Sequence, residues 1–228
     1  MHSIIDRLHG KIHQNKDSCL RIGMINLSKE ERLVTDYHDR HLIEGAIRPE
    51  VWEAFSQLNK ATFANDLGPQ LSLEVFTVAS QGAGCLHCQA HGAYGLALME
   101  VDTDRIQELW SFEHSDSFSE ADRAALRFAL AAAKAPNEVT PEHHRKMREH
   151  YSDEEIADIL SIVCVAGWLN RWNDSLATVT DQESIDWAKD NLSTVGWSAG
   201  KHRGDAAEQR QAHPATMWRQ GKDPLQRD

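Results

Sequence analysis

The chain has 228 residues, of which 41% are hydrophobic, which is enough to bury the core of one domain with extensions. Its formal net charge of −11 opposes attraction to a polyphosphate backbone, so nucleic acid is not an expected partner. No apolar run approaches the roughly 20 residues of a membrane helix, and four cysteines with a charged N-terminus indicate a reducing, cytoplasmic setting.

Helical periodicity dominates the sequence and predicts an all-α fold, a helical bundle with N- and C-terminal extensions. Residues 1–45 are polar and are expected to form the N-terminal extension. A first helix is expected from Pro49, because proline suits the first turn of a helix. A second helix, over residues 71–80, is mostly apolar and carries a single acid, Glu74.

Turn and capping signals set the bounds of the later helices. The Gly82-Ala83-Gly84 break ends the second helix, so the next should run from about Cys85 to Met99. Ser119 can cap an alanine-rich helix that reaches Lys134, and Thr140-Pro141 starts a short one. Ser152-Asp153-Glu154-Glu155 is a capping box, and it opens the longest helix, which extends towards Leu176.

We therefore expect a helical domain over residues 46–180 and a C-terminal arm over residues 181–228. The sequence from Gly200 onward has no steady apolar stripe. The second half nevertheless contains tryptophans that are costly to expose: Trp187, Trp197 and Trp218. The arm should therefore pack on a neighbouring subunit, which predicts a homo-oligomer.

The most informative motif is Cys85-Leu86-His87-Cys88-Gln89-Ala90-His91. A thiol at the first turn of a helix meets unpaired backbone N–H groups and the helix dipole, and both favour the reactive thiolate. Cys88 and His91 are neighbours on a helix, so the imidazole can hold or shuttle the thiol proton, and a disulfide between Cys85 and Cys88 is sterically plausible. A buried Glu74 needs a partner, and an imidazole is its natural one.

A zinc site is the main alternative for this motif. Cys85, Cys88, His91 and His87 could supply ligands, but zinc usually collects them from two separate elements. The alternative to an enzyme is thus a metal-binding or non-catalytic oligomeric protein of the same fold, and the preferred interpretation needs neither a metal nor a bound cofactor. The remaining thiols, Cys19 and Cys164, are expected to be inert. Cys164 should be a small core residue.

A glutamate on one helix followed by Cys-x-x-Cys and a histidine on the next resembles the alkylhydroperoxidase D and carboxymuconolactone decarboxylase superfamily. The likeness covers roughly residues 45–180 and extends to three further segments: Ser119-Glu120-Ala121-Asp122, Ser152-Asp153-Glu154-Glu155-Ile156 and Asn170-Arg171. Ten residues separate Glu74 from Cys85, and two separate Cys88 from His91. Each interval is one residue shorter than is usual in that family.

The resemblance implies an all-α protein that assembles as a trimer or hexamer. It implies that Cys88 attacks peroxide and that Cys85 is its disulfide partner, with Glu74 and His91 as the proton relay and His87 beside it. True decarboxylases of the superfamily lack the paired cysteines, so a decarboxylase-like lyase remains only an alternative. We expect a thiol-dependent oxidoreductase that reduces a hydroperoxide or disulfide and is regenerated by an external dithiol.

Overall fold

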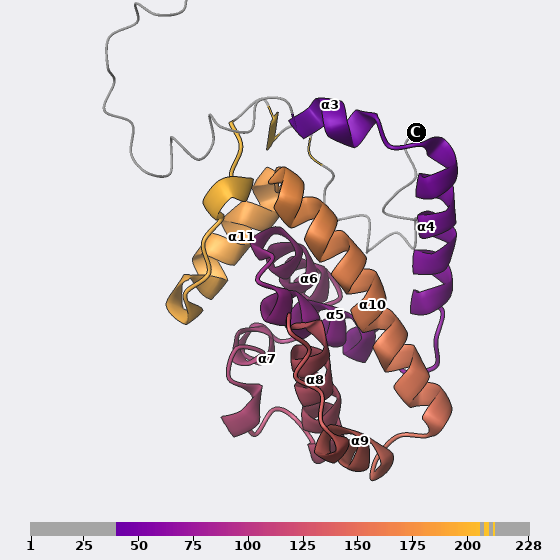
Figure 1. Ribbon diagram of the computed structural model, residues 1–228. Coiled ribbons are helices and arrows are strands. Elements are labelled where there is room, and N and C mark those ends of the chain that lie inside the picture. Colours follow the sequence, from indigo (N-terminus) through magenta and orange to yellow (C-terminus); the bar gives the residue numbers. More distant parts are fainter. Residues whose placement is uncertain (1–39, 206–207, 210–211, 213–228) are drawn as a thin grey trace, which may run out of the picture. The chain divides into compact units, whose positions relative to one another are not determined.

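The computed structural model describes residues 40–205, 208–209 and 212, and it confirms the all-α fold class (Figure 1). Within these residues every regular element is helical and no strand occurs. The α-helices are α3 (Arg40–Gly45), α4 (Pro49–Phe63), α5 (Pro69–Ala83), α6 (Leu86–Leu98), α7 (Thr103–Glu108), α8 (Glu120–Ala133), α9 (Pro141–Arg148), α10 (Asp153–Leu176) and α11 (Gln182–Leu192). The 3₁₀ turns are η1 (Phe112–His114), η2 (Ser193–Val195) and η3 (Gly200–His202).

The capping signals in the sequence mark the true helix starts. Ser119 Oγ accepts a hydrogen bond from the Asp122 amide at 3.1 Å, which satisfies one of the free N–H groups at the start of α8. At the start of α10 the Ser152 amide donates to Glu155 Oε2 at 2.8 Å, which completes the expected capping box. Both predicted helix starts are therefore confirmed.

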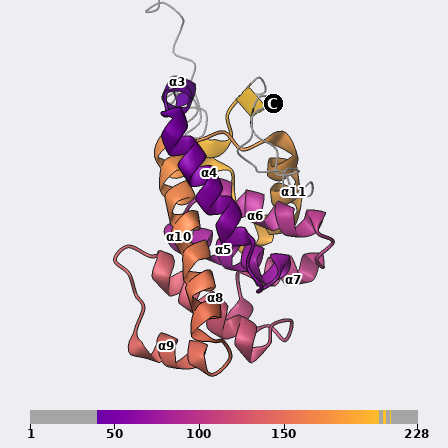
Figure 2. The ribbon, with the colours of Figure 1, turned by 90° about the vertical axis from the view of Figure 1, so that its right-hand side faces the viewer.

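Helix α5 forms the centre of the bundle, because α6, α8 and α10 all pack against it. Its residues from Ser72 to Ser80 are all buried, so this middle part of the helix presents no face to solvent. Figure 1 shows α10 crossing over α5 and α6, and Figure 2 shows α4 lying along α10, with which it is in contact. The core is formed where these helices meet. In the described part of the chain, no helix is long and apolar enough to cross a membrane.

Two glycines position α6 against α5. Gly84 ends α5 in the left-handed conformation at φ 77°, which lets the chain turn directly into α6. Gly92 lies at a close approach of the two helices, since a Cβ atom there would be 2.2 Å from Thr77 Oγ1. The tight contact holds the first turn of α6, which carries the Cys-x-x-Cys pair, inside the bundle.

The segment that follows α10 folds back onto α6 of the same chain. Helix α11 packs on α6 and α7, and Trp197, 6% exposed, donates from Nε1 to the Leu86 carbonyl at 3.0 Å. The expectation that this tryptophan packs on a neighbouring subunit is therefore wrong, because the first turn of α6 supplies both an apolar surface and a hydrogen-bond acceptor. Trp187 is also partly buried against the core of its own chain, whereas Trp218 lies outside the described residues.

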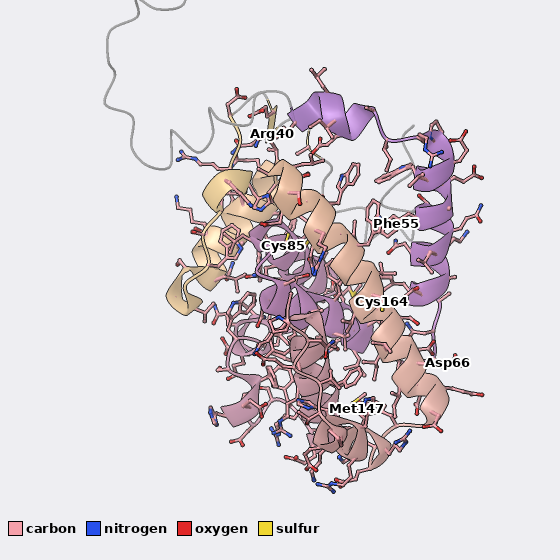
Figure 3. All side chains as sticks on the ribbon, viewed as in Figure 1. Arg40, Phe55, Asp66, Cys85, Met147 and Cys164 are labelled. Carbon is pink, nitrogen blue, oxygen red and sulfur yellow. The ribbon has the colours of Figure 1, made fainter. Side chains whose placement is uncertain are left out.

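An ion pair joins the segments at the two ends of the described chain. The guanidinium of Arg40 (labelled in Figure 3) donates to both carboxylate oxygens of Glu208 at 2.9 Å. It also donates to the Ala177 carbonyl at 2.8 Å, just after α10. The side chain of Arg40 is 3% exposed, so this two-pronged contact anchors α3 to the region that follows α10.

Candidate active site

The two thiols of the motif lie together at the start of α6. Cys85 occupies the capping position, with extended backbone angles, and Cys88 lies in the first turn. Their exposed fractions are 0% and 2%, so both are enclosed by the bundle, and Figure 3 labels Cys85 in this position. A hydrogen bond joins the two side chains, and both are reduced.

This hydrogen bond makes one thiol of the pair more acidic than the other. Cys88 donates to Cys85 and, together with backbone N–H groups at the helix start, lowers the pKa of the Cys85 thiol despite its burial. Burial raises the pKa of the Cys88 thiol well above its ordinary value, and the adjacent Cys85 sulfur adds to this. Asn173 Nδ2 on α10 donates to Cys88 Sγ at 3.4 Å. Of the two thiols, Cys85 therefore loses its proton more readily, and Cys88 is the one that stays protonated.

Both histidines of the motif have oxygen partners on the segment before α11. His91 Nε2 lies 2.8 Å from Asp181 Oδ2, and the two side chains are 15% and 5% exposed. His87, which is buried, has its Nδ1 atom 2.9 Å from Thr180 Oγ1. The ring centroids of His87 and His91 are 4.2 Å apart, so the two imidazoles are in contact.

A third imidazole, that of His202 in η3, continues this row towards Cys85. Its ring centroid is 5.7 Å from that of His87. Its Nδ1 donates to the Thr178 carbonyl at 2.8 Å, and its Nε2 lies 3.4 Å from Asp174 Oδ1. Burial lowers the pKa of His202, so the neutral ring is favoured. The three histidines connect the partly exposed His91 to the buried thiol.

Glu74 lies elsewhere and is not the partner of His91. Its carboxylate, 1% exposed, accepts hydrogen bonds from Arg105 Nε at 2.7 Å and Nη2 at 3.0 Å. Gln70 Nε2 also donates to it, at 2.9 Å. The expected pairing of Glu74 with His91 is therefore wrong. The buried Glu74 carboxylate pairs with Arg105, whose guanidinium can donate to both of its oxygens, and His91 pairs with Asp181.

The structure adds polar residues from α10 and the following segment that the sequence analysis did not assign to the site. They are Asn173, Asp174, Thr180, Asp181 and His202. Asn170 lies one turn before Asn173 and is 2% exposed. No described residue forms a hydrogen bond with its side-chain amide. The signal for the asparagines was present, because polar residues interrupt an otherwise apolar helix there. His202 has no comparable local signal.

The thiols outside the motif do not contribute to this site in the described part of the chain. Cys164 (labelled in Figure 3) is exposed on α10, so its expected role as a core residue is wrong. Its neighbours Ile162, Val163 and Val165 are buried, and the helical turn places Cys164 on the opposite side. Cys19 lies outside the described residues.

Comparison with solved structures identifies the fold. One similar structure is that of the debrominase Bmp8, in a Cys-to-Ala variant bound to 2,3,4-tribromopyrrole. It superposes with a TM-score of 0.62 and 23% identity over 74% of this chain and 94% of that protein. A peroxidase-related alkylhydroperoxidase D core protein from Ralstonia eutropha JMP134 gives a TM-score of 0.56 and 23% identity over 68% of this chain and 86% of that one. A protein of unknown function from Agrobacterium tumefaciens gives 0.55 and 22% identity over 58% and 92%.

Sequence comparison alone is less informative. No family model matches the chain. The uncharacterized protein YdfG of Bacillus subtilis (strain 168) is 24% identical over 128 residues, which is 56% of this chain and 85% of that protein. The solved structures therefore identify the fold, and they show that the chain has an alkylhydroperoxidase D-like fold.

Proposed function

We propose that this protein is a thiol-dependent oxidoreductase that reduces a hydroperoxide or a disulfide with its Cys85–Cys88 pair. The observation that carries this proposal is the pair of buried thiols that lie together at a helix start, one with a lowered and the other with a raised pKa. A thiolate is the nucleophile, and a neighbouring protonated thiol is what resolves the oxidised product. The fold, which the chain shares with alkylhydroperoxidase D proteins, is consistent with this chemistry.

The reaction needs two electrons, and the thiol pair supplies both. The Cys85 thiolate attacks the distal oxygen of a hydroperoxide, the O–O bond breaks, and the leaving alkoxide takes up a proton as alcohol. Cys88 then attacks the resulting sulfenic acid, which forms a Cys85–Cys88 disulfide and releases water. An external dithiol reduces this disulfide by thiol–disulfide exchange and restores the enzyme. No bound cofactor is required.

The histidine row is the proposed proton path. Asp181 orients His91 through their 2.8 Å contact, the His91 ring contacts that of His87, and His87 in turn lies next to His202. A carboxylate that holds one ring nitrogen fixes the tautomer of the other, as a general acid or base requires. Asp181 thus takes the place that the sequence resemblance gives to Glu74.

The order of the two cysteines is the point on which geometry and family resemblance differ. The resemblance implies that Cys88 attacks and Cys85 resolves, whereas the electrostatics favour Cys85 as the attacking thiolate. Single variants separate the two assignments. With Cys85 as nucleophile, Cys88→Ser should still react once with hydroperoxide and accumulate a sulfenic acid at Cys85, which a dimedone-type reagent traps.

The test is a coupled assay with an organic hydroperoxide and a dithiol reductant. Turnover should be lost in Cys85→Ser and in Cys88→Ser and retained in Cys164→Ser, which removes an exposed thiol outside the site. Full turnover in both Cys85→Ser and Cys88→Ser would end the proposal. Sulfenic acid trapped at Cys88 in Cys85→Ser, with no reaction of Cys88→Ser, would reverse the order of the thiols.

Reductive dehalogenation is a second candidate, favoured by the structural similarity to a debrominase over 74% of this chain. The same two electrons would replace a carbon–halogen bond with carbon–hydrogen, release halide and leave the Cys85–Cys88 disulfide. A brominated pyrrole in the same assay distinguishes the two reactions. Bromide release that exceeds hydroperoxide turnover would favour dehalogenation, and its absence would exclude this candidate for that substrate.

We also propose that the subunits form a homo-oligomer. Large apolar side chains are exposed on α3, α4 and α10: Leu42, Ile43, Val51, Leu58 and Leu160. Apolar surface of this kind on neighbouring elements favours association, and closed symmetric assemblies are its usual result. Light scattering should give the mass of a trimer or hexamer. A monomer that persists at high concentration would contradict this proposal.

A further inference from the structure

The sulfur of Cys85 also lies close to two other side chains that could bind a metal ion together with it. Cys85 Sγ, a carboxylate oxygen of Asp174 and a ring nitrogen of His202 all lie within 4.8 Å of one another. They come from three separate elements: the start of α6, the last turns of α10, and η3. We name these residues the Cys85–Asp174–His202 cluster.

The hydrogen bonding of His202 directs a lone pair into this cluster. A carbonyl can only accept, so the 2.8 Å contact with the Thr178 carbonyl requires Nδ1 to donate. In the neutral ring Nε2 then carries a lone pair, and it faces Asp174 Oδ1, also an acceptor, at 3.4 Å. Two acceptors this close repel one another, and a cation between them, either a proton or a metal ion, removes the repulsion. A backbone carbonyl on the second nitrogen is typical of metal-binding histidines.

The spacing of the cluster suits a small tetrahedral ion. Zinc bonds to sulfur at about 2.3 Å and to nitrogen or oxygen at about 2.0 to 2.1 Å, so its tetrahedral ligands lie about 3.3 to 3.8 Å from one another. The His202–Asp174 distance of 3.4 Å falls in this range, and the Cys85 sulfur, within 4.8 Å of both ligand atoms, would complete the set by moving closer as the ion binds. Lys201 Nζ binds the other carboxylate oxygen of Asp174 at 2.9 Å, which leaves Oδ1 for the ion.

We propose that the reduced protein binds one zinc-class divalent cation through Cys85, Asp174 and His202. Thiolate, imidazole and carboxylate together are the ligand set that zinc accepts, and three protein ligands leave one position for water or an added ligand. The site differs from a zinc site built on the motif alone, because His91 and His87 are held by Asp181 and Thr180.

Metal binding and thiol oxidation exclude one another in this arrangement. A bound ion takes the Cys85 sulfur electrons that would attack a substrate, and a Cys85–Cys88 disulfide removes the only sulfur ligand of the cluster. The ion therefore holds the thiol unreactive, and oxidation releases the ion. The binding itself requires only reduced Cys85 and is independent of the proposed reaction.

The test uses the reduced, chelator-stripped full chain and a competing chromophoric chelator to measure Zn²⁺ affinity and stoichiometry. One Zn²⁺ per chain is expected, and Asp174→Asn and His202→Gln should weaken binding about 100-fold, since even outer-shell changes at metal sites weaken binding by roughly 10 to 100-fold. His91→Gln and Cys164→Ser are matched controls that should bind as the wild type does. Co²⁺ should give a thiolate charge-transfer band that disappears in Cys85→Ser.

Three outcomes would overturn the proposal. One is the absence of stoichiometric Zn²⁺ in protein whose thiols are shown to be reduced. Another is unchanged affinity in Asp174→Asn, a half-exposed position whose substitution leaves the core intact. The third is loss of binding in His91→Gln instead, which would move the metal to the helical motif. None of these measurements uses turnover, so they leave the proposed oxidoreductase function to be judged separately.

Discussion

The ion pair of Glu74 and Arg105 should contribute strongly to stability, and Arg105→Ala tests this. The substitution removes two short hydrogen bonds, at 2.7 and 3.0 Å, from a carboxylate that is 1% exposed. It also removes a guanidinium that lies 4.3 Å above the centre of the Phe118 ring. Gln70 would remain as a donor in the variant, but it carries no charge to balance the carboxylate.

The expected loss follows from burial. Removing one partner of a buried ion pair costs about 3 to 5 kcal/mol, because the other charge is left uncompensated. The Arg105 side chain is 20% exposed, and the remaining Gln70 donor offsets part of the loss, so we expect the low end, about 3 kcal/mol. In a protein of this size each kcal/mol moves the melting temperature by roughly 2 to 4 °C. Arg105→Ala should therefore melt about 6 to 12 °C below the wild type.

Chemical denaturation and thermal melting measure this, and Arg127→Ala is the matched control. Arg127 also pairs with a glutamate, Glu113, but the two side chains are 35% and 38% exposed. Exposed pairs contribute about 1 kcal/mol or less, so this control should lose little. If Arg105→Ala loses no more stability than Arg127→Ala, Glu74 is not held as a structural ion, and its assignment to a proton relay reopens.

Two further predictions concern packing and acid stability. Gly92→Ala would place its Cβ 2.2 Å from Thr77 Oγ1 and should destabilise the protein by roughly 1 to 3 kcal/mol, whereas Gly167→Ala, with no atom within 4 Å, should stabilise it by roughly 0.5 to 1 kcal/mol in urea titrations. Burial raises the pKa of Asp181, but hydrogen bonds from His91 and Ser184 outweigh this and lower it overall. The wild type should therefore have a higher free energy of unfolding than Asp181→Asn, and this difference should be complete above about pH 4 to 5 and decline as acid protonates Asp181. A difference that grows on acidification would contradict this.

The fold was largely predictable because its signals are local. Pro49, Ser119, Ser152 and Gly84 act within one turn of the helix ends that they set, so capping and turn propensities identify them without knowledge of the tertiary structure. Helix α11 was missed because its apolar residues are few, and its burial depends on contact with α6 and α7.

The site was predictable only where it lies within one helix. Cys85, Cys88 and His91 are close because helical spacing places them so, but Asp181 and His202 reach them through the folding of α10 and the segment after it.

We propose that Cys85 is the more acidic of the two thiols and that Cys88 stays protonated beside it. The most direct test exposes reduced, metal-free protein briefly to a small alkylating reagent across a range of pH, and mass spectrometry then measures modification at each cysteine. The structure predicts that Cys85 reacts before Cys88 and that its rate reaches half-maximum at a lower pH than in the denatured chain, where thiols have pKa values of about 8.5. Modification of Cys88 first, or a Cys85 midpoint no lower than in denaturant, would contradict the assignment.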